Sequence, residues 1–423
     1  MTGRLKRQIV FFTITFFLIL VESTEISANE IWTLTTAPYN SWVAVAGSAD
    51  GNTLAAVSDG GSIYISTNSG AAWTQATNAP GDYWTCICIS DDGSKIAAGI
   101  DGGLIYVSQD FGVKWRLTSA PPNYWECITC SADGKKLAAA AYSDGLDNNV
   151  PGQIHLSTDW GHTWKTPHVA QNSKQRQFWL AITSSFDGSK LAAVDAGGSI
   201  YTSKDSGLSW KLTGAPNESW FGIASSTNGN KLVAVANAGP IYTSVNGGLT
   251  WIAATNAPNA GWASVASSSD GKKLAAVQWG GQIYTSADSG ISWSQNSLPN
   301  TFSAGGLWGI ASSQDGSKIL AAGDGIYGGP IYLFQPTPIL DIANNDTNVI
   351  VSWPCSATGF VLKKNSDLTT PNWTDAGIIP KVVNGRNQMK LPRVGMQFYR
   401  LEFPTGTAPW WSDWPPFVPP LDL

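Results

Sequence analysis

Charged side chains are scarce in this sequence: they make up 13% of its 423 residues, while hydrophobic residues make up 43%. Disordered chains show the opposite balance, so we expect a globular fold. Basic residues are also in the minority, with 25 Lys and Arg against 30 Asp and Glu. Because binding to phosphate backbones depends on clustered Lys and Arg, the sequence predicts no nucleic-acid partner.

A hydrophobic run long enough to cross a membrane is also missing. The apolar run Ile9–Val21 has about 13 residues, whereas a spanning helix needs roughly 20. It follows three basic residues and precedes a small-residue site near Ala28, which is the pattern of a signal peptide. We predict a signal peptide over residues 1–28 and a mature protein that is secreted, periplasmic or on the cell surface, without stable membrane insertion. The alternative is an uncleaved membrane anchor.

Cysteine and histidine are rare as well. The five cysteines are Cys86, Cys88, Cys127, Cys130 and Cys355, and export would permit disulfides among them. Cys86 and Cys127, however, occupy one position of a repeat where other copies have Ala, Gly or Ser. We therefore interpret Cys86 and Cys127 as residues that fill a small space, in preference to members of a disulfide or a metal site. The three histidines, His155, His162 and His168, are seven and six residues apart, a spacing that places them on different strands or loops, so we predict no metal site and no cofactor.

The abundant residues are Gly and Trp, with 44 and 21 copies. One Trp series, with spacings of 42, 41, 54, 41 and 42 residues, consists of Trp42, Trp84, Trp125, Trp179, Trp220 and Trp262. A second series consists of Trp73, Trp115, Trp164, Trp210, Trp251 and Trp293. Each period contains four strand-length segments separated by turns. Four strands in about 42 residues are typical of a propeller blade, because one such sheet buries its faces only against neighbouring sheets.

The seventh copy of the repeat lacks its fourth strand, because the chain runs into Pro336 and Pro338 without a second Trp. The missing strand has a donor at the other end of the repeat, since Trp32–Thr35 matches the fourth-strand segment Trp210–Thr213. We therefore predict an all-β fold, a seven-bladed β-propeller over residues 29–335 that the N-terminal strand closes. Closure removes the free sheet edges.

The repeat stops near Gln335, and strand-like segments such as Val349–Trp353 follow at a different spacing. We interpret residues 336–403 as a small β-sandwich-like domain of the fibronectin or immunoglobulin kind. Residues 404–423 contain three Trp among six Pro, which predicts an extended tail.

The turn before each Trp of the second series has a common sequence. It reads SQDFGVKW at residues 108–115, and Asn68 and Asn246 replace the Asp in two of the six copies. This resembles the Asp-box, or BNR repeat, of sialidase-like β-propellers over roughly residues 31–335. The resemblance implies that the box is structural and lies opposite the ligand site, and it extends to non-catalytic members such as photosystem II assembly factor-like propellers.

A sialidase of this kind would need three arginines to clamp a substrate carboxylate, and the repeat region has two, Arg116 and Arg176. It also has few glutamates, Glu126 and Glu218 after Glu30, to activate a Tyr nucleophile. Sialidase activity is therefore not expected, and no catalytic residue is predicted. The alternative is a glycoside hydrolase of an Asp-box family that uses paired Asp residues about 5–10 Å apart.

Acidic residues lie in corresponding connections between second and third strands, in or beside which are Asp59, Asp101, Asp195 and Asp324. Acids often occupy turns simply because they are solvated there. Because these turns belong to one face of the disc, Asp59 and Asp101 are also candidates for ligand binding.

Two kinds of aromatic residue compete for a role on that face. The first Trp series recurs in nearly every copy, which favours a place in the core over a ring of exposed platforms. Aromatic residues that differ between blades are better candidates for specificity, namely Tyr83, Tyr124, Tyr142, Phe178 and Trp279. Two insertions interrupt the third blade, around residues 142–151 and 166–178, and long departures from a repeat often carry function. We interpret the protein as an exported binding or interaction protein that recognises a glycan or a protein.

Overall fold

The computed structural model describes most of the repeat region and parts of the region after it. The described residues are 31–143, 151–167, 177–298, 306–324, 328–335, 340–344, 348–354, 360–367, 370, 372–383, 386–392 and 397–402. The predicted signal peptide, the predicted tail and most of both third-blade insertions lie outside them. Every regular element within the described residues is a β-strand, as the all-β prediction requires.

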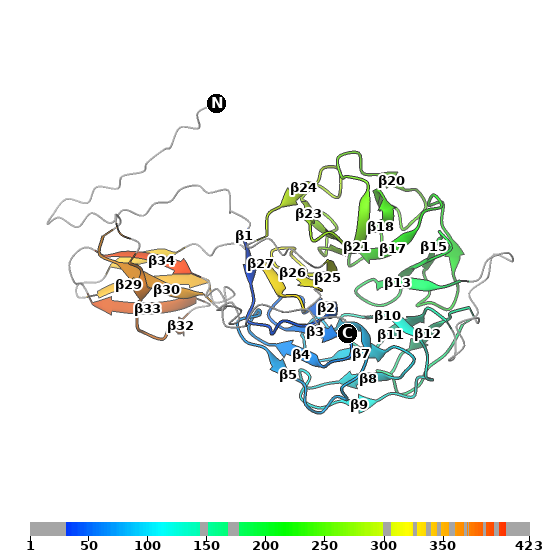
Figure 1. Cartoon of the computed structure of the whole chain (residues 1–423), viewed down its shortest axis with the longest axis horizontal. Helices are drawn as coiled ribbons and strands as arrows, with labels where there is room; N and C mark the ends of the chain where they lie inside the picture. The colour runs from blue at the N-terminus through cyan, green and yellow to red at the C-terminus, as the bar shows by residue number, and fades with distance from the viewer. Residues whose placement is uncertain are drawn as a thin grey trace, which may run out of the picture.

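Antiparallel strands follow one another outward from the axis in each blade (Figure 1). Blade one contains β2 (Trp42–Gly47), β3 (Leu54–Ser58), β4 (Ile63–Ser66) and β5 (Thr74–Gln75). Blade two contains β6 (Trp84–Ile89), β7 (Ile96–Ile100), β8 (Ile105–Ser108) and β9 (Arg116–Leu117). Blade three contains β10 (Trp125–Cys130), β11 (Leu137–Ala141) and β12 (Ile154–Ser157), with a bridge from Leu156 to Lys165 in place of a fourth strand.

The remaining blades repeat this order. Blade four contains β13 (Trp179–Ser184), β14 (Leu191–Asp195), β15 (Ile200–Ser203) and β16 (Lys211–Leu212). Blade five contains β17 (Trp220–Ser225), β18 (Leu232–Gly239), β19 (Ile241–Ser244) and β20 (Ile252–Ala253). Blade six contains β21 (Ala260–Ser267), β22 (Leu274–Gln278), β23 (Ile283–Ser286) and β24 (Ser294–Asn296). Blade seven contains β25 (Leu307–Ser312), β26 (Ile319–Gly323), β27 (Ile331–Gln335) and β1 (Ile31–Leu34).

The ring closes through its first and last strands. β1 pairs antiparallel with β27, with Trp32 opposite Phe334, so the N-terminal segment supplies the outer strand of blade seven as predicted. Each inner strand contacts the inner strand of the next blade, and β25 contacts β2. Within the described residues the blades therefore form a closed ring of seven.

Packing between blades explains the composition of the strands. The first-series Trp residues are almost fully buried, and Trp42 meets the Tyr64 ring of its own blade edge-on, with centroids 5.3 Å apart. These indoles belong to the core, so the alternative of exposed platforms is wrong for them. Second strands such as β3 and β14 are buried along their whole length, because neighbouring blades cover both of their faces. Their alanines leave room for this close approach.

One end of the disc consists of tight polar turns. In each Asp-box turn the Ser hydroxyl accepts the N–H of the Gly, as from Gly112 to Ser108 at 3.0 Å, and the Asp or Asn accepts an N–H further on, as from Lys114 to Asp110 at 2.8 Å. In the turn of Asp159, burial opposes ionisation, but hydrogen bonds from the hydroxyl and N–H of Thr163 and from the Ser157 hydroxyl lower the pKa of the carboxyl group to about 2. The Ser, Asp and Asn side chains of the Asp-box, which the resemblance implies are structural, therefore form hydrogen bonds within their own turns.

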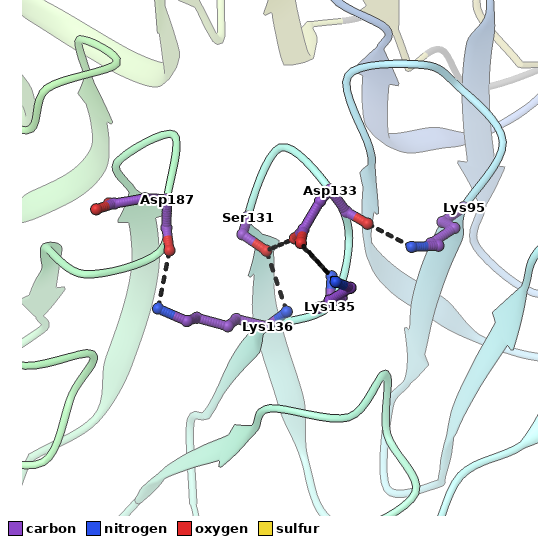
Figure 2. A network of polar contacts seen from close by, with 6 residues as sticks. All are labelled: Lys95, Ser131, Asp133, Lys135, Lys136 and Asp187. Atoms are coloured by element: carbon purple, nitrogen blue, oxygen red, sulfur yellow. Dashed lines mark hydrogen bonds and ion pairs between the residues drawn. The ribbon is translucent and has the colours of Figure 1, made fainter.

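Lysines at this turn end join neighbouring blades (Figure 2). Lys136 of blade three donates to the carbonyl oxygen of Asp187 in blade four at 2.9 Å, and Lys95 of blade two donates to that of Asp133 in blade three. Asp133 also accepts a hydrogen bond from Ser131 at 2.7 Å. Lys95 and Lys136 thus join neighbouring blades at this end.

The C-terminal region forms two sheets. The first has the order β28 (Asp341–Asn344), β29 (Asn348–Pro354), β33 (Arg386–Pro392) and β32 (Lys381–Val383). The second has the order β31 (Thr374–Asp375), β30 (Val361–Asn365) and β34 (Phe398–Glu402). Trp353 and Leu362, one from each sheet, share a buried core, which makes this region a β-sandwich. The order of the first sheet is that of strands A, B, E and D in immunoglobulin-type sandwiches.

Candidate functional site

Every blade presents two residues, joined by one backbone hydrogen bond, at the end of the disc opposite the Asp-box turns. In each blade, one N–H at the exit of the second strand bonds to the carbonyl oxygen of the residue just before the first buried residue of the inner strand, such as Trp42. In blade five the donor, Asn237, still lies within β18. The donor and acceptor pairs are Asp59 and Ser41, Asp101 and Tyr83, Tyr142 and Tyr124, Ala196 and Phe178, Asn237 and Ser219, Trp279 and Gly261, and Asp324 and Gly306, at 2.7–3.0 Å. We call this end the loop-pair face. All seven residues predicted from the sequence to bind a ligand belong to these pairs.

Trp279 is the centre of an aromatic cluster on the loop-pair face. Its ring lies 5.0 Å from Phe221 and 4.2 Å from Trp308, both close to perpendicular. Its Nε1 donates to the carbonyl oxygen of Trp262 at 3.1 Å, which fixes the indole. Blades five, six and seven therefore share one preorganised aromatic surface, which we call the aromatic cluster (Phe221, Trp279 and Trp308).

A second aromatic contact joins blades three and four. The rings of Tyr142 and Phe178 are 4.8 Å apart with an angle of 30° between their planes. Tyr142 is 39% exposed and Tyr83 is 60% exposed, while Tyr124 is half-buried. Large rings of this kind bury much apolar area on binding at a low cost in side-chain entropy.

Carboxylates from blades one to three form an acidic group on the same face, consisting of Asp59, Asp101 and Glu126. Burial, with the Asp101 charge added, raises the pKa of Glu126 to about 7. Burial and the charge of Asp59 also raise the pKa of Asp101. Asp101 therefore lies near both Asp59 and Glu126, and no Lys or Arg of the described residues forms an ion pair with these three carboxylates.

Asp195 differs from the other predicted acids. It pairs with Trp179 inside the blade, as Ser58 pairs with Trp42, so it precedes the position of Asp59 by one residue. It is almost fully buried, and burial raises its pKa. Asp195 is therefore not a fourth member of the exposed acidic set.

Three residues of the site were not singled out in the sequence: Glu126, Phe221 and Trp308. Each is the second residue of its inner strand, at a register irregularity where the first residue is buried. This position differs in every blade, with Val43, Thr85, Glu126, Leu180, Phe221, Ala263 and Trp308. Comparing this one repeat position between the blades of the sequence would have identified all three residues, because the residue there varies.

Other features of the described residues do not add chemistry to the site. No group of three or more His, Cys, Asp or Glu side chains among them is arranged to hold a metal ion, and His168 lies outside them. A cavity of about 90 Å³ lies between blades four and five at the turn end, beside Lys190 and Asn246. Because the turn end is opposite the loop-pair face, this cavity is a space between blades and not part of the site. No helix within the described ranges is long and apolar enough to span a membrane.

The cysteines of blades two and three are free thiols. Cys86, Cys88, Cys127 and Cys130 form no disulfide with one another, while Cys355 lies outside the described residues. Cys86 and Cys88 are buried, and burial raises the pKa of Cys86 to about 12. The small-space interpretation of Cys86 and Cys127 fits this packing.

The fold and the site together define a β-propeller with an aromatic and acidic end. Solved structures that share the fold are "YCF48 bound to D1 peptide", with a TM-score of 0.56, 14% identity and coverage of 72% of this chain and 96% of that one, and YCF48 from Cyanidioschyzon merolae, with a TM-score of 0.56, 16% identity and coverage of 72% and 98%. The propeller domain of Cps50 (Swd1) from Myceliophteria thermophila gives a TM-score of 0.57, 15% identity and coverage of 72% and 99%. No family model matches the chain, and no curated protein matches its sequence. At these identities the likeness establishes the β-propeller fold alone.

Proposed function

We propose that this protein is an exported binding protein that recognises a segment of another protein through the loop-pair face. The observation that carries the proposal is the aromatic cluster around Trp279, where three blades hold large rings in place. Hydrogen bonding and ring contacts fix the cluster before any ligand arrives. Preorganised aromatic surfaces of this kind dominate the energetics of protein interfaces.

Two further observations support the proposal. A propeller of the same fold has been solved as YCF48 bound to the D1 peptide, so this architecture accommodates a peptide ligand. Export is supported by the signal-peptide pattern of residues 1–28. The bond pattern of six turns, such as Ser108–Asp110 and Ser286–Asp288, supports assignment to the Asp-box propellers.

A glycan is the second candidate ligand. The observation that favours it is Tyr83, which is 60% exposed and is the most exposed of the five predicted aromatic residues. An exposed ring beside carboxylates such as Asp101 suits stacking on a sugar and hydrogen bonding to its hydroxyl groups.

Selection from a phage-displayed peptide library tests the proposal. The mature chain, residues 29–423, should enrich peptides that bind it, and the double variant Tyr142→Ala, Trp279→Ala should bind them at least tenfold more weakly. Phe186→Ala is a matched control, because Phe186 is an exposed aromatic residue, 53% accessible, in a turn at the opposite end. Thermal unfolding confirms that each variant folds.

Two outcomes would contradict the proposal. Selected peptides that bind the double variant as tightly as the native protein would place the binding site elsewhere. Failure to enrich any peptide, combined with glycan-array binding lost in a Tyr83→Ala variant, would favour the glycan. Hydrolysis of the bound glycan would support the alternative function, a glycoside hydrolase that uses paired Asp residues.

A further inference from the structure

Lysines are distributed unevenly between the two ends of the propeller, whereas acidic residues occur at both ends. The connections that form the loop-pair face carry several acids, which are Asp59, Asp82, Asp101, Glu218 and Asp324. Within the described residues of these connections there is no Lys or Arg. Lysines fill the turns of the opposite end instead, namely Lys95, Lys114, Lys135, Lys136, Lys190, Lys204, Lys231, Lys272, Lys273 and Lys318.

Several of these lysines have partners in the fold. Several bond across blade boundaries, as Lys190 does to the carbonyl oxygen of Asn228 at 2.8 Å and Lys318 to Asn52 at 2.7 Å. The two ion pairs of the propeller among the described residues, Lys135 with Asp133 and Lys272 with Asp270, also lie at that end. The acidic group of the loop-pair face therefore has no partner cation in the described part of the chain.

Buried polar atoms at the loop-pair end are also left unpaired. Asp195 and Gln278 are both more than nine-tenths buried, and Asp195 Oδ1 and Gln278 Nε2 have no hydrogen-bond partner in the structure. They directly precede Ala196 and Trp279, which are members of the loop pairs. Burying a polar atom without a partner costs free energy, and these two atoms belong to blades four and six rather than to the acidic group of blades one to three.

We propose that the protein segment recognised by the loop-pair face is cationic, with a Lys or Arg side chain against Asp59, Asp101 and Glu126 and an apolar side chain against the aromatic cluster. This inference rests on the proposed function and names its ligand chemistry. A guanidinium or ammonium group bonds to carboxylates with charge-assisted hydrogen bonds and relieves their mutual repulsion. Arg also packs favourably over aromatic rings.

The sequence itself supplies conservative variants for the test. Blade five has Asn237 at the position of Asp59 and Asp101, so Asp59→Asn with Asp101→Asn introduces a residue that the fold already accepts there. Blade five also has Asn228 at the position of Asp133, where both residues accept a hydrogen bond from the preceding Ser. Asp133→Asn is therefore the matched control at the opposite end.

The experiment sequences the phage pool selected on the full mature chain and then measures the affinity of the leading peptide by fluorescence anisotropy. The pool should contain at least twice the Lys and Arg content of the unselected library. The double variant Asp59→Asn, Asp101→Asn should bind the leading peptide about five- to tenfold more weakly at 50 mM salt, and by a smaller factor at 300 mM. Asp133→Asn should bind within twofold of the native protein.

The outcomes separate this inference from the proposed function. Peptides without an excess of basic residues, whose binding still requires Tyr142 and Trp279, would overturn the cationic ligand and leave protein recognition standing. Equal binding by the native protein and the Asp59→Asn, Asp101→Asn variant would overturn it in the same way. If no peptide is enriched, both the proposed function and this inference fail.

Discussion

The backbone N–H of Gln314 in blade seven donates to the carbonyl oxygen of Ala49 in blade one at 2.8 Å. Six equivalent bonds of 2.7–2.9 Å link the other neighbouring blades, through Ala49, Asp91, Ala132, Phe186, Thr227, Ser269 and Gln314 in turn. The result is a closed belt of backbone hydrogen bonds at the turn end of the axis. Together with the pairing of β1 and β27, the belt joins the first and last blades at two separate places.

The outer closure should carry much of the stability of the ring. Trp32 of β1 is buried and lies 5.5 Å from Phe334 of β27. Trp32→Ala leaves a large cavity there, and we expect it to reduce the free energy of unfolding by about 3–5 kcal/mol, measured by urea denaturation. Ile291→Ala is the control, since Ile291 is 73% exposed and its loss should change stability by less than about 0.5 kcal/mol. Equal effects of the two substitutions would show that β1 is dispensable for closure.

Glu126 should make stability depend on pH in the neutral range. Its folded-state pKa of about 7 lies above the ordinary value of 4.5 because the carboxyl group is buried near Asp101. A raised pKa means that this group's stabilising contribution is complete below pH 4.5 and is lost as the pH rises through 7. Glu126→Gln should therefore be more stable than the native protein at pH 8, by roughly 1–3 kcal/mol, and the difference should shrink toward pH 5.

Urea denaturation at pH 5, 6, 7 and 8 measures this effect. Asp133→Asn is a suitable control, because hydrogen bonds from Ser131 and the Lys135 backbone lower the pKa of Asp133. A lowered carboxyl pKa affects stability only in acid, so this variant should show the native pH dependence between pH 5 and 8. Parallel curves for Glu126→Gln and the native protein would disprove the assignment.

The propeller could be predicted from the sequence because its signals are local. Each Trp, such as Trp42, lies at a fixed distance from its turn, and the fourth-strand sequence of Trp32–Leu34 identifies the closing strand. The loop pairs follow from the same register, which is why Tyr83 and Trp279 could be assigned to the same end of the disc from the sequence. Asp195 shares the turn spacing of Asp59 but lies one position earlier in the strand, and spacing alone does not separate neighbouring positions of opposite burial.

The rest of the site depends on contacts between distant blades. Trp308 and Phe221 meet Trp279 from different blades, and repeat spacing alone does not show which inner-strand side chains turn toward the loop-pair face. The lysines that join blades, such as Lys136 with Asp187, bond across 51 residues of sequence. Such contacts follow from the radius and twist of the ring, which a linear pattern does not contain.

The thiols of blades two and three should resist modification in the folded protein. Burial raises the pKa of Cys86 to about 12 and also raises those of Cys88 and Cys127. Because the thiolate is the reactive species, we expect iodoacetamide at pH 8 to leave these three residues unlabelled until urea unfolds the chain. Peptide mapping by mass spectrometry under non-reducing conditions provides the measurement. Disulfide-linked peptides from β6 and β10 would contradict it.

In blades two and five, one equivalent pair of residues has its small and its large member exchanged between the first and second strands. Cys86 of β6 pairs with Gly99 of β7, whereas Gly222 of β17 pairs with Val235 of β18. A Cβ atom at Gly99 would lie 2.9 Å from Cys86 Sγ, so a branched side chain at Gly99 would press against the Cys86 thiol. We expect Gly99→Val to destabilise the protein by about 1–3 kcal/mol through overpacking.

A double-mutant cycle tests this exchange of volume. Adding Cys86→Gly to Gly99→Val recreates the pair of blade five and should recover most of the lost stability, although Cys86→Gly alone should leave a cavity and destabilise the protein. Because the two side chains are in contact, their effects should depart from additivity by about 1 kcal/mol or more. If urea denaturation shows that the two losses of stability are additive, then other neighbours of Gly99, such as the Trp125 Cβ at 3.1 Å, oppose the larger side chain instead of Cys86.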